Sequence, residues 1–123
     1  MSDDLRHQLG AAGEALAAAH LERMGMRILA RNVRTRFGEL DIVAADARTL
    51  VFCEVKTRRD GAEPNPLGGL RRDQQRRIRA MAVAWLSTAP ATARRADLRF
   101  DAIGVVIDGR GRLISLEHLE ACF

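Results

Sequence analysis

The order of segments in this chain predicts an α/β domain in which helices pack on a central mixed sheet of about five strands. Residues 71–87 show the clearest amphipathic pattern, because their apolar residues recur at helical spacing. Short apolar segments with strand-like alternation lie around it, in the order helix, three strands, helix, two strands. The predicted helices span 4–24 and 71–87, and the predicted strands span 26–33, 38–46, 50–57, 98–107 and 112–116.

The two predicted helices differ in their apolar patterns. In the first, Gly25 is well placed to end the helix, and apolar residues recur at positions 5, 9, 12, 16 and 19. In the second, one apolar stripe consists of Ile78, Met81, Ala82, Trp85 and Leu86. Because Trp85 lies on this stripe, we expect it in the core rather than on a surface that stacks on nucleobases.

Polar and apolar residues alternate in the predicted strand at 38–46. Leu40 and Ile42 are expected on one face of the sheet, and Glu39 and Asp41 on the other. The strand is otherwise strongly apolar, so its carboxylates do not belong to an ordinary solvated face.

The next predicted strand contains the only lysine of the chain. Lys56 is one of 20 basic residues, and all the others are arginine. Glu54 and Lys56 are two residues apart, so they share one face of the strand. A short hairpin joins this strand to the preceding one and can bring Asp41 beside both side chains. The sequence therefore predicts a patch of two carboxylates and one ammonium group.

Two carboxylates on a mostly buried sheet repel each other unless a cation lies between them. A hard divalent ion such as Mg²⁺ (or Mn²⁺) prefers oxygen ligands. We therefore expect Asp41 and Glu54 to bind the metal, with the carbonyl of Val55 as a third ligand. Lys56 would contact a water or the scissile phosphate, a role that suits lysine in general because it is a compact point charge, whereas arginine is a wide planar fork that effectively never loses its proton. A structural ion-pair cluster is the alternative interpretation.

Length and composition fit one domain spanning residues 1–123 with a single hydrophobic core. No apolar run approaches the roughly 18 residues of a membrane span. The first residues are acidic and lack the apolar segment of a secretory signal. Cys53 and Cys122 have neither metal-ligand spacing nor a disulfide-rich context. These observations predict a cytoplasmic protein without a membrane partner.

The net charge of +4 and the isoelectric point of about 10.3 favour a polyanionic partner, first of all nucleic acid. Only 4% of the residues are aromatic, so recognition of the phosphate backbone fits better than stacking on single-stranded bases. Two prolines and three glycines predict a mobile loop over 58–69. The side chains expected to contact nucleic acid are Arg34, Arg36, Arg58, Arg59, Arg72, Gln74, Arg76 and Arg77. For those on the second helix, a solvated face is the alternative.

The D…ExK pattern of Asp41, Glu54 and Lys56 resembles that of the PD-(D/E)xK nuclease superfamily, whose fold is the restriction-endonuclease-like α/β core. The segments GAAGEALAAAHLERMGMRILARNVRTRFGELDIVAAD and LVFCEVKTR look like those of the small bacterial UPF0102 family, also called the YraN proteins. The resemblance extends to RFDAIGVV and LEHLEACF near the end of the chain. Archaeal Holliday-junction resolvases are similar in core layout, including a glutamate on the first helix that Glu14 matches.

The resemblance implies a three-layer sandwich in which helices flank the central mixed sheet. It implies that Asp41 and Glu54 bind metal, that Lys56 is catalytic and that Glu14 is an accessory catalytic carboxylate. Glu39, which is expected on the face of Asp41, would support the metal ligands. Because resolvase-like relatives act as dimers, the resemblance leaves a homodimer open beside a monomer.

The leading hypothesis from the sequence is an Mg²⁺-dependent endonuclease-like protein that hydrolyses phosphodiester bonds of DNA, including branched or otherwise structured DNA. One alternative is a nucleic-acid-binding module of the same fold without catalytic activity. Another is a protein–protein adaptor in which the acidic patch is structural.

For Glu14 the alternative is an ordinary surface glutamate. Gln74 stands where many relatives place a lysine, so it keeps a hydrogen-bond donor but loses a charge.

Overall fold

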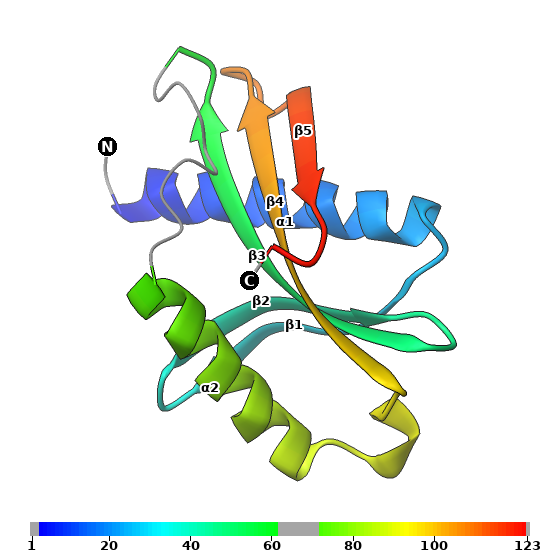
Figure 1. The fold of residues 1–123 in the computed structure, drawn as a ribbon. Helices are drawn as coiled ribbons and strands as arrows, with labels where there is room; N and C mark the ends of the chain where they lie inside the picture. Colours follow the sequence, from blue (N-terminus) through cyan, green and yellow to red (C-terminus); the bar gives the residue numbers. More distant parts are fainter. Residues whose placement is uncertain (1–2, 62–71, 123) are drawn as a thin grey trace.

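The computed structural model describes residues 3–61 and 72–122, and the predicted order of helices and strands is confirmed (Figure 1). Residues 62–69 of the predicted loop lie outside the described residues, whereas Arg58 and Arg59 belong to the end of a strand instead. The elements are α1 (Asp3–Arg23), β1 (Arg27–Thr35), β2 (Gly38–Ala45), β3 (Thr49–Arg59), α2 (Arg72–Thr88), a 3-10 turn (Ala91–Ala93), β4 (Asp97–Ile107) and β5 (Leu113–Leu119).

The five strands form one mixed sheet in the order β1-β2-β3-β4-β5. β3 and β4 run parallel, and each other neighbouring pair runs antiparallel. Parallel strands cannot be joined by a tight hairpin, so the chain crosses over through α2 between them. α1 and α2 lie on opposite faces of the sheet, which gives the three layers expected from the sequence (Figure 1).

Each face of the sheet has its own apolar cluster. On the α1 side, Leu21 packs with Ile42, Ile103 and other side chains of the central strands. On the α2 side, Phe52 packs with Met81 and, edge to face, with Trp85. The expected core position of Trp85 is therefore confirmed. Neither helix in the described part of the chain is both long and apolar enough to cross a membrane.

The expected alternation of β2 is wrong at one point. Leu40 belongs to the cluster on the α2 side, whereas Ile42 belongs to the cluster on the α1 side. Residues two apart in a regular strand share a face, so the strand is irregular between them, at Asp41. The ladder between β2 and β3 begins only at the pair Ile42–Cys53, so the two strands separate at this irregularity.

Close packing of α1 on β3 brings the helix near the place where β2 and β3 separate. A side chain at Gly13 would place its Cβ in steric overlap with the Oγ1 atom of Thr57, which leaves space for glycine alone. The next residue, Glu14, is thereby held near the place where β2 and β3 part.

Candidate metal centre

Asp41 and Glu54 face each other where β2 and β3 part. Asp41 Oδ2 accepts a hydrogen bond of 2.8 Å from the backbone N–H of Val55, so a side chain takes the place of a strand partner. The carboxylate of Glu54 lies close enough for its negative charge to act on Asp41. The structure thus brings together the two carboxylates that the sequence places on neighbouring strands. For Val55 the observed contact is through its N–H, and metal binding by its carbonyl stays a prediction.

Two further carboxylates join Asp41 from other positions. One carboxylate oxygen each of Glu14, Glu39 and Asp41 lies within 4.8 Å of the others. Glu39, expected only to support the ligands, belongs to this group, whereas Glu54 lies outside it and contacts Asp41 from β3. We call Glu14, Glu39, Asp41 and Glu54 the carboxylate cluster.

Lys56 supplies an ammonium group beside this cluster. Its Nζ lies 3.4 Å from Glu54 Oε1, and the exposed fractions of the two side chains are 36% and 16%. The lone lysine is therefore paired with the glutamate two residues before it, as their shared face predicts. The partly exposed ammonium remains accessible to solvent.

Two carboxylates of the cluster have raised pKa values, although Lys56 and Arg34 lie beside the cluster. Burial, followed by the negative charge of Glu54, raises the pKa of Asp41 to about 8, although the hydrogen bond from Val55 acts in the opposite direction. Burial and the charge of Glu39 also raise the pKa of Glu14, while Arg31 and Asn32 act to lower it. A site that disfavours its own carboxylate charges in this way is one that a bound cation would stabilise.

Asn32 also contacts the cluster, although it was not predicted to do so from the sequence. This residue lies in β1 with a positive φ of 51°, and its amide nitrogen donates hydrogen bonds to Glu14 (2.5 Å) and Glu39 (3.1 Å) when the amide is oriented towards the carboxylates. An asparagine in the middle of a strand segment is a usable signal, because asparagine is depleted in strands and tolerates left-handed backbone.

A depression of about 430 Å³ opens over Glu14 and Glu39, the two members of the cluster that line it. Its wall includes Arg6, His7, Glu14, Asn32, Arg34 and Glu39. Arg6 and His7 come from the first turns of α1, and neither was predicted from the sequence to belong to the site. The Glu14–Glu39 side of the cluster thus faces solvent through an opening with basic groups on its wall.

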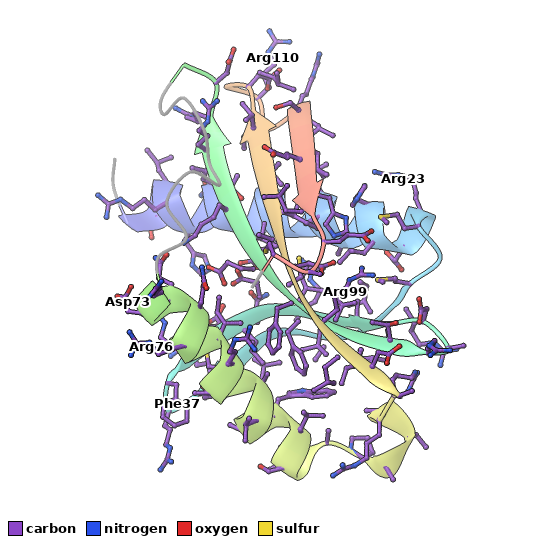
Figure 2. All side chains as sticks on the ribbon, viewed as in Figure 1. Arg23, Phe37, Asp73, Arg76, Arg99 and Arg110 are labelled. Atoms are coloured by element: carbon purple, nitrogen blue, oxygen red, sulfur yellow. The ribbon has the colours of Figure 1, made fainter. Side chains whose placement is uncertain are left out.

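Six of the eight predicted phosphate-contacting residues fall into two groups. Arg34 and Arg36 lie on and beside the β1–β2 hairpin, where Arg36 stacks 4.7 Å from the ring centre of Phe37. Arg72, Gln74, Arg76 and Arg77 lie on the first turns of α2. The two groups adjoin, because the side chain of Arg77 lies beside Gly38 of the hairpin. Figure 2 shows Phe37 at the end of the hairpin beside α2, with Arg76 projecting from α2 on the same side.

Arg58 and Arg59 lie apart from these groups in the fold. They end β3, where they pair with Val106 and Ile107 of β4. Arg59 lines a different depression, between the start of α1 and the β4–β5 turn. The structure therefore gives Arg59 no place on the wall of the depression over the cluster.

A second polar network joins residues that appear isolated in the sequence. Asp101 is fully buried and forms two hydrogen bonds of 2.9 Å with Arg99. His118 lies 2.8 Å from Asp101 and 3.1 Å from His20 of α1. The backbone N–H of Ala121 also donates to Asp101. This network ties the end of α1 and the end of the chain to β4, and spacing along the sequence gives no sign of it.

Comparison with known proteins places this chain in a family. The model of the "Uncharacterised protein family UPF0102" matches residues 13–105, a span that contains the whole carboxylate cluster, Asn32 and Lys56. A UPF0102 protein of Mycobacterium avium is 50% identical over 118 residues, which cover 94% of this chain and 89% of that protein.

Two other relatives give the same result. A UPF0102 protein of Rhodococcus opacus is 44% identical over 115 residues, covering 94% of this chain and 95% of that protein. One of Acidothermus cellulolyticus is 55% identical over 87 residues, covering 71% of this chain and 66% of that protein. With its mixed five-stranded sheet between two helices, the chain belongs to UPF0102, the YraN family of the restriction-endonuclease-like superfamily.

Proposed function

We propose that this protein is a divalent-metal-dependent nuclease that hydrolyses phosphodiester bonds of DNA. The observation that carries the proposal is the carboxylate cluster at the separation of β2 and β3, with the only lysine of the chain paired to it. A purely structural ion-pair cluster would balance its charges, whereas here the pKa of Asp41 is raised by burial and by neighbouring carboxylates.

The donor set fits a hard divalent cation. All of its donors are carboxylate oxygens, which come from α1 (Glu14), β2 (Glu39 and Asp41) and β3 (Glu54). Hard divalent cations prefer such oxygen ligands to sulfur or imidazole. Asp41 is central, because one of its oxygens lies within 4.8 Å of those of Glu14 and Glu39 while the charge of Glu54 acts on it from β3. When bound, Mg²⁺ or Mn²⁺ supplies a Lewis acid that polarises the phosphate and acidifies a water molecule.

Lys56 has the position and the chemistry for a direct catalytic role. Its Nζ is held 3.4 Å from Glu54, so the ammonium stays next to the cluster. From there it can contact a phosphate oxygen or orient the attacking water as a compact charge. Arginine would present a wide planar fork with a permanently high pKa, which suits phosphate binding but not the exchange of a proton.

The substrate would be held through its phosphates. Arg6 and Arg34 lie on the wall of the depression, and Arg36 with the α2 arginines extends the basic surface beyond it. Arginine contacts to phosphates position DNA without reading its sequence. This arrangement favours recognition of backbone shape, in line with the low aromatic content.

The proposal is tested by a cleavage assay on linear, single-stranded, flapped and four-way-junction DNA with Mg²⁺ or Mn²⁺. We expect the wild type to cleave at least one substrate, and Lys56→Ala and Lys56→Arg to lose at least about a hundredfold in rate, the loss typical of a missing acid–base group. Arg110→Ala, which removes one exposed positive charge from the β4–β5 turn, is the matched control and should retain the activity.

Equal cleavage by the wild type and Lys56→Ala would show a contaminating nuclease and contradict the proposal. DNA binding without cleavage of any substrate would instead support the binding module without catalysis. A protein that neither binds nor cleaves DNA would support the adaptor.

A further inference from the structure

We propose that Asn32 is a positioning residue that holds Glu14 and Glu39 together for metal binding. The inference rests on the proposed metal centre and adds to it a residue that no D…ExK pattern contains. Its basis is a combination of an unusual backbone conformation with two directed hydrogen bonds.

The backbone of Asn32 is unusual for a strand. Its φ of 51° is left-handed, and in the described ranges 3–61 and 72–122 only Ala121 shares this feature among residues other than glycine. The pairs Arg31–Ile42 and Val33–Leu40 flank it, so Asn32 lies opposite Asp41 across the β1–β2 ladder. Two irregular positions, one on each strand, therefore coincide at the cluster. A conformation of this kind costs free energy and tends to occur at functional sites.

The side chain of Asn32 joins two elements through the cluster. With the amide oriented towards the carboxylates, its nitrogen donates to Glu14 Oε2 at 2.5 Å and to Glu39 Oε1 at 3.1 Å, so one hydrogen bond reaches α1 and the other reaches β2. The second oxygen of Glu14 is left for a cation, and that of Glu39 lies 3.8 Å from the highly exposed Arg34. Two like charges are thus held close together by a donor that bears no charge.

Asparagine suits this position better than the other residue types. Arginine or lysine would neutralise the cluster and compete with a metal ion, and aspartate would add another negative charge. Glycine would accept the left-handed backbone but has no donor, and alanine lacks the donor and strains the backbone. Groups that orient metal-binding side chains typically contribute about tenfold to a hundredfold in metal affinity.

The test compares Asn32→Gly with Asn32→Ala in the full chain by calorimetric titration with Mn²⁺. Asn32→Gly keeps the backbone conformation and removes only the amide, so we expect its Mn²⁺ affinity to fall by about tenfold or more. Asn32→Ala should lose at least as much affinity. The melting temperature of Asn32→Gly in EDTA should stay within a few degrees of the wild type, which separates positioning from folding.

A double variant tests whether Asn32 acts through Glu14. In Glu14→Gln the carboxylate that Asn32 positions is already altered, so adding Asn32→Gly should reduce Mn²⁺ affinity by much less than it does in the wild type. Fully additive losses, or wild-type affinity in Asn32→Gly, would overturn the inference while leaving the metal centre intact. A wild type that binds no Mn²⁺ would instead overturn the proposed metal centre, and the role of Asn32 with it.

Discussion

Asp41 is the residue whose ionisation the fold alters most clearly. In the metal-free protein its pKa is raised from 3.8 to about 8, first by burial and then by the charge of Glu54. Between these values the folded protein holds a proton that the unfolded chain releases. The free energy of unfolding should therefore fall as the pH rises from about 4 to about 8. The slope from this one group is at most about 1.4 kcal/mol per pH unit.

Substitution of Asp41 by asparagine tests this pH dependence. The asparagine side chain cannot titrate, so Asp41→Asn should be more stable than the wild type above pH 8 in EDTA, with a flatter profile. Urea unfolding at a series of pH values measures both curves. Parallel curves for the two proteins would show that the pKa of Asp41 is not raised in the folded state.

For single residues, the sequence predicts some members of the candidate site and misses others. Asp41, Glu54 and Lys56 follow from alternation on two strands joined by a hairpin. Asn32 and the change of face between Leu40 and Ile42 do not, because an irregularity within a strand breaks the alternation on which such predictions depend.

The contact of α1 with β3 determines where Glu14 lies. Gly13→Ala would bring a Cβ into overlap with Thr57 Oγ1, so the helix must shift. We expect the free energy of unfolding to fall by about 1–3 kcal/mol, as overpacking usually costs, and the Mn²⁺ affinity to fall because Glu14 moves with the helix.

Gly10→Ala is the matched control on the same helix. Nothing lies within 4 Å of a Cβ at Gly10, so alanine should stabilise the helix by up to about 1 kcal/mol. Chemical unfolding and Mn²⁺ titration of both variants measure the difference. Equal stabilities would mean that α1 does not pack closely on β3 at Gly13.

The elements themselves were largely predictable, and their extents differ for tertiary reasons. β3 continues to Arg59 because it pairs along its whole length with β4, a parallel partner that local sequence cannot indicate. β5 continues to Leu119, past the predicted end at residue 116, because Glu117, His118 and Leu119 pair with β4 and His118 contacts the buried Asp101. Both extensions depend on contacts between residues far apart in the chain.

The whole molecule combines a positive net charge with the negative carboxylate cluster. We call Arg6 and Arg34 on the wall of the depression, together with Arg36 and the arginines of α2, the basic rim. If the rim binds DNA, affinity should fall with salt, with a slope in a log–log plot of about −0.9 for each phosphate neutralised. Arg34→Ala and Arg76→Ala should each reduce that slope by about one unit. Arg110→Ala, from the β4–β5 turn, should leave it unchanged. Fluorescence anisotropy over a salt series measures these slopes, and equal slopes for all three variants would place the DNA surface elsewhere.

The central claim is that the carboxylate cluster binds a divalent cation. Calorimetric titration of the full chain with Mn²⁺ at several pH values tests it most directly, beside Asp41→Asn and Glu117→Gln, an exposed carboxylate on β5. We predict binding that strengthens as the pH approaches 8 and the proton of Asp41 is released. Asp41→Asn should lose that binding, and Glu117→Gln should retain it. No heat of binding in the wild type, or equal affinity in Asp41→Asn, would contradict the claim.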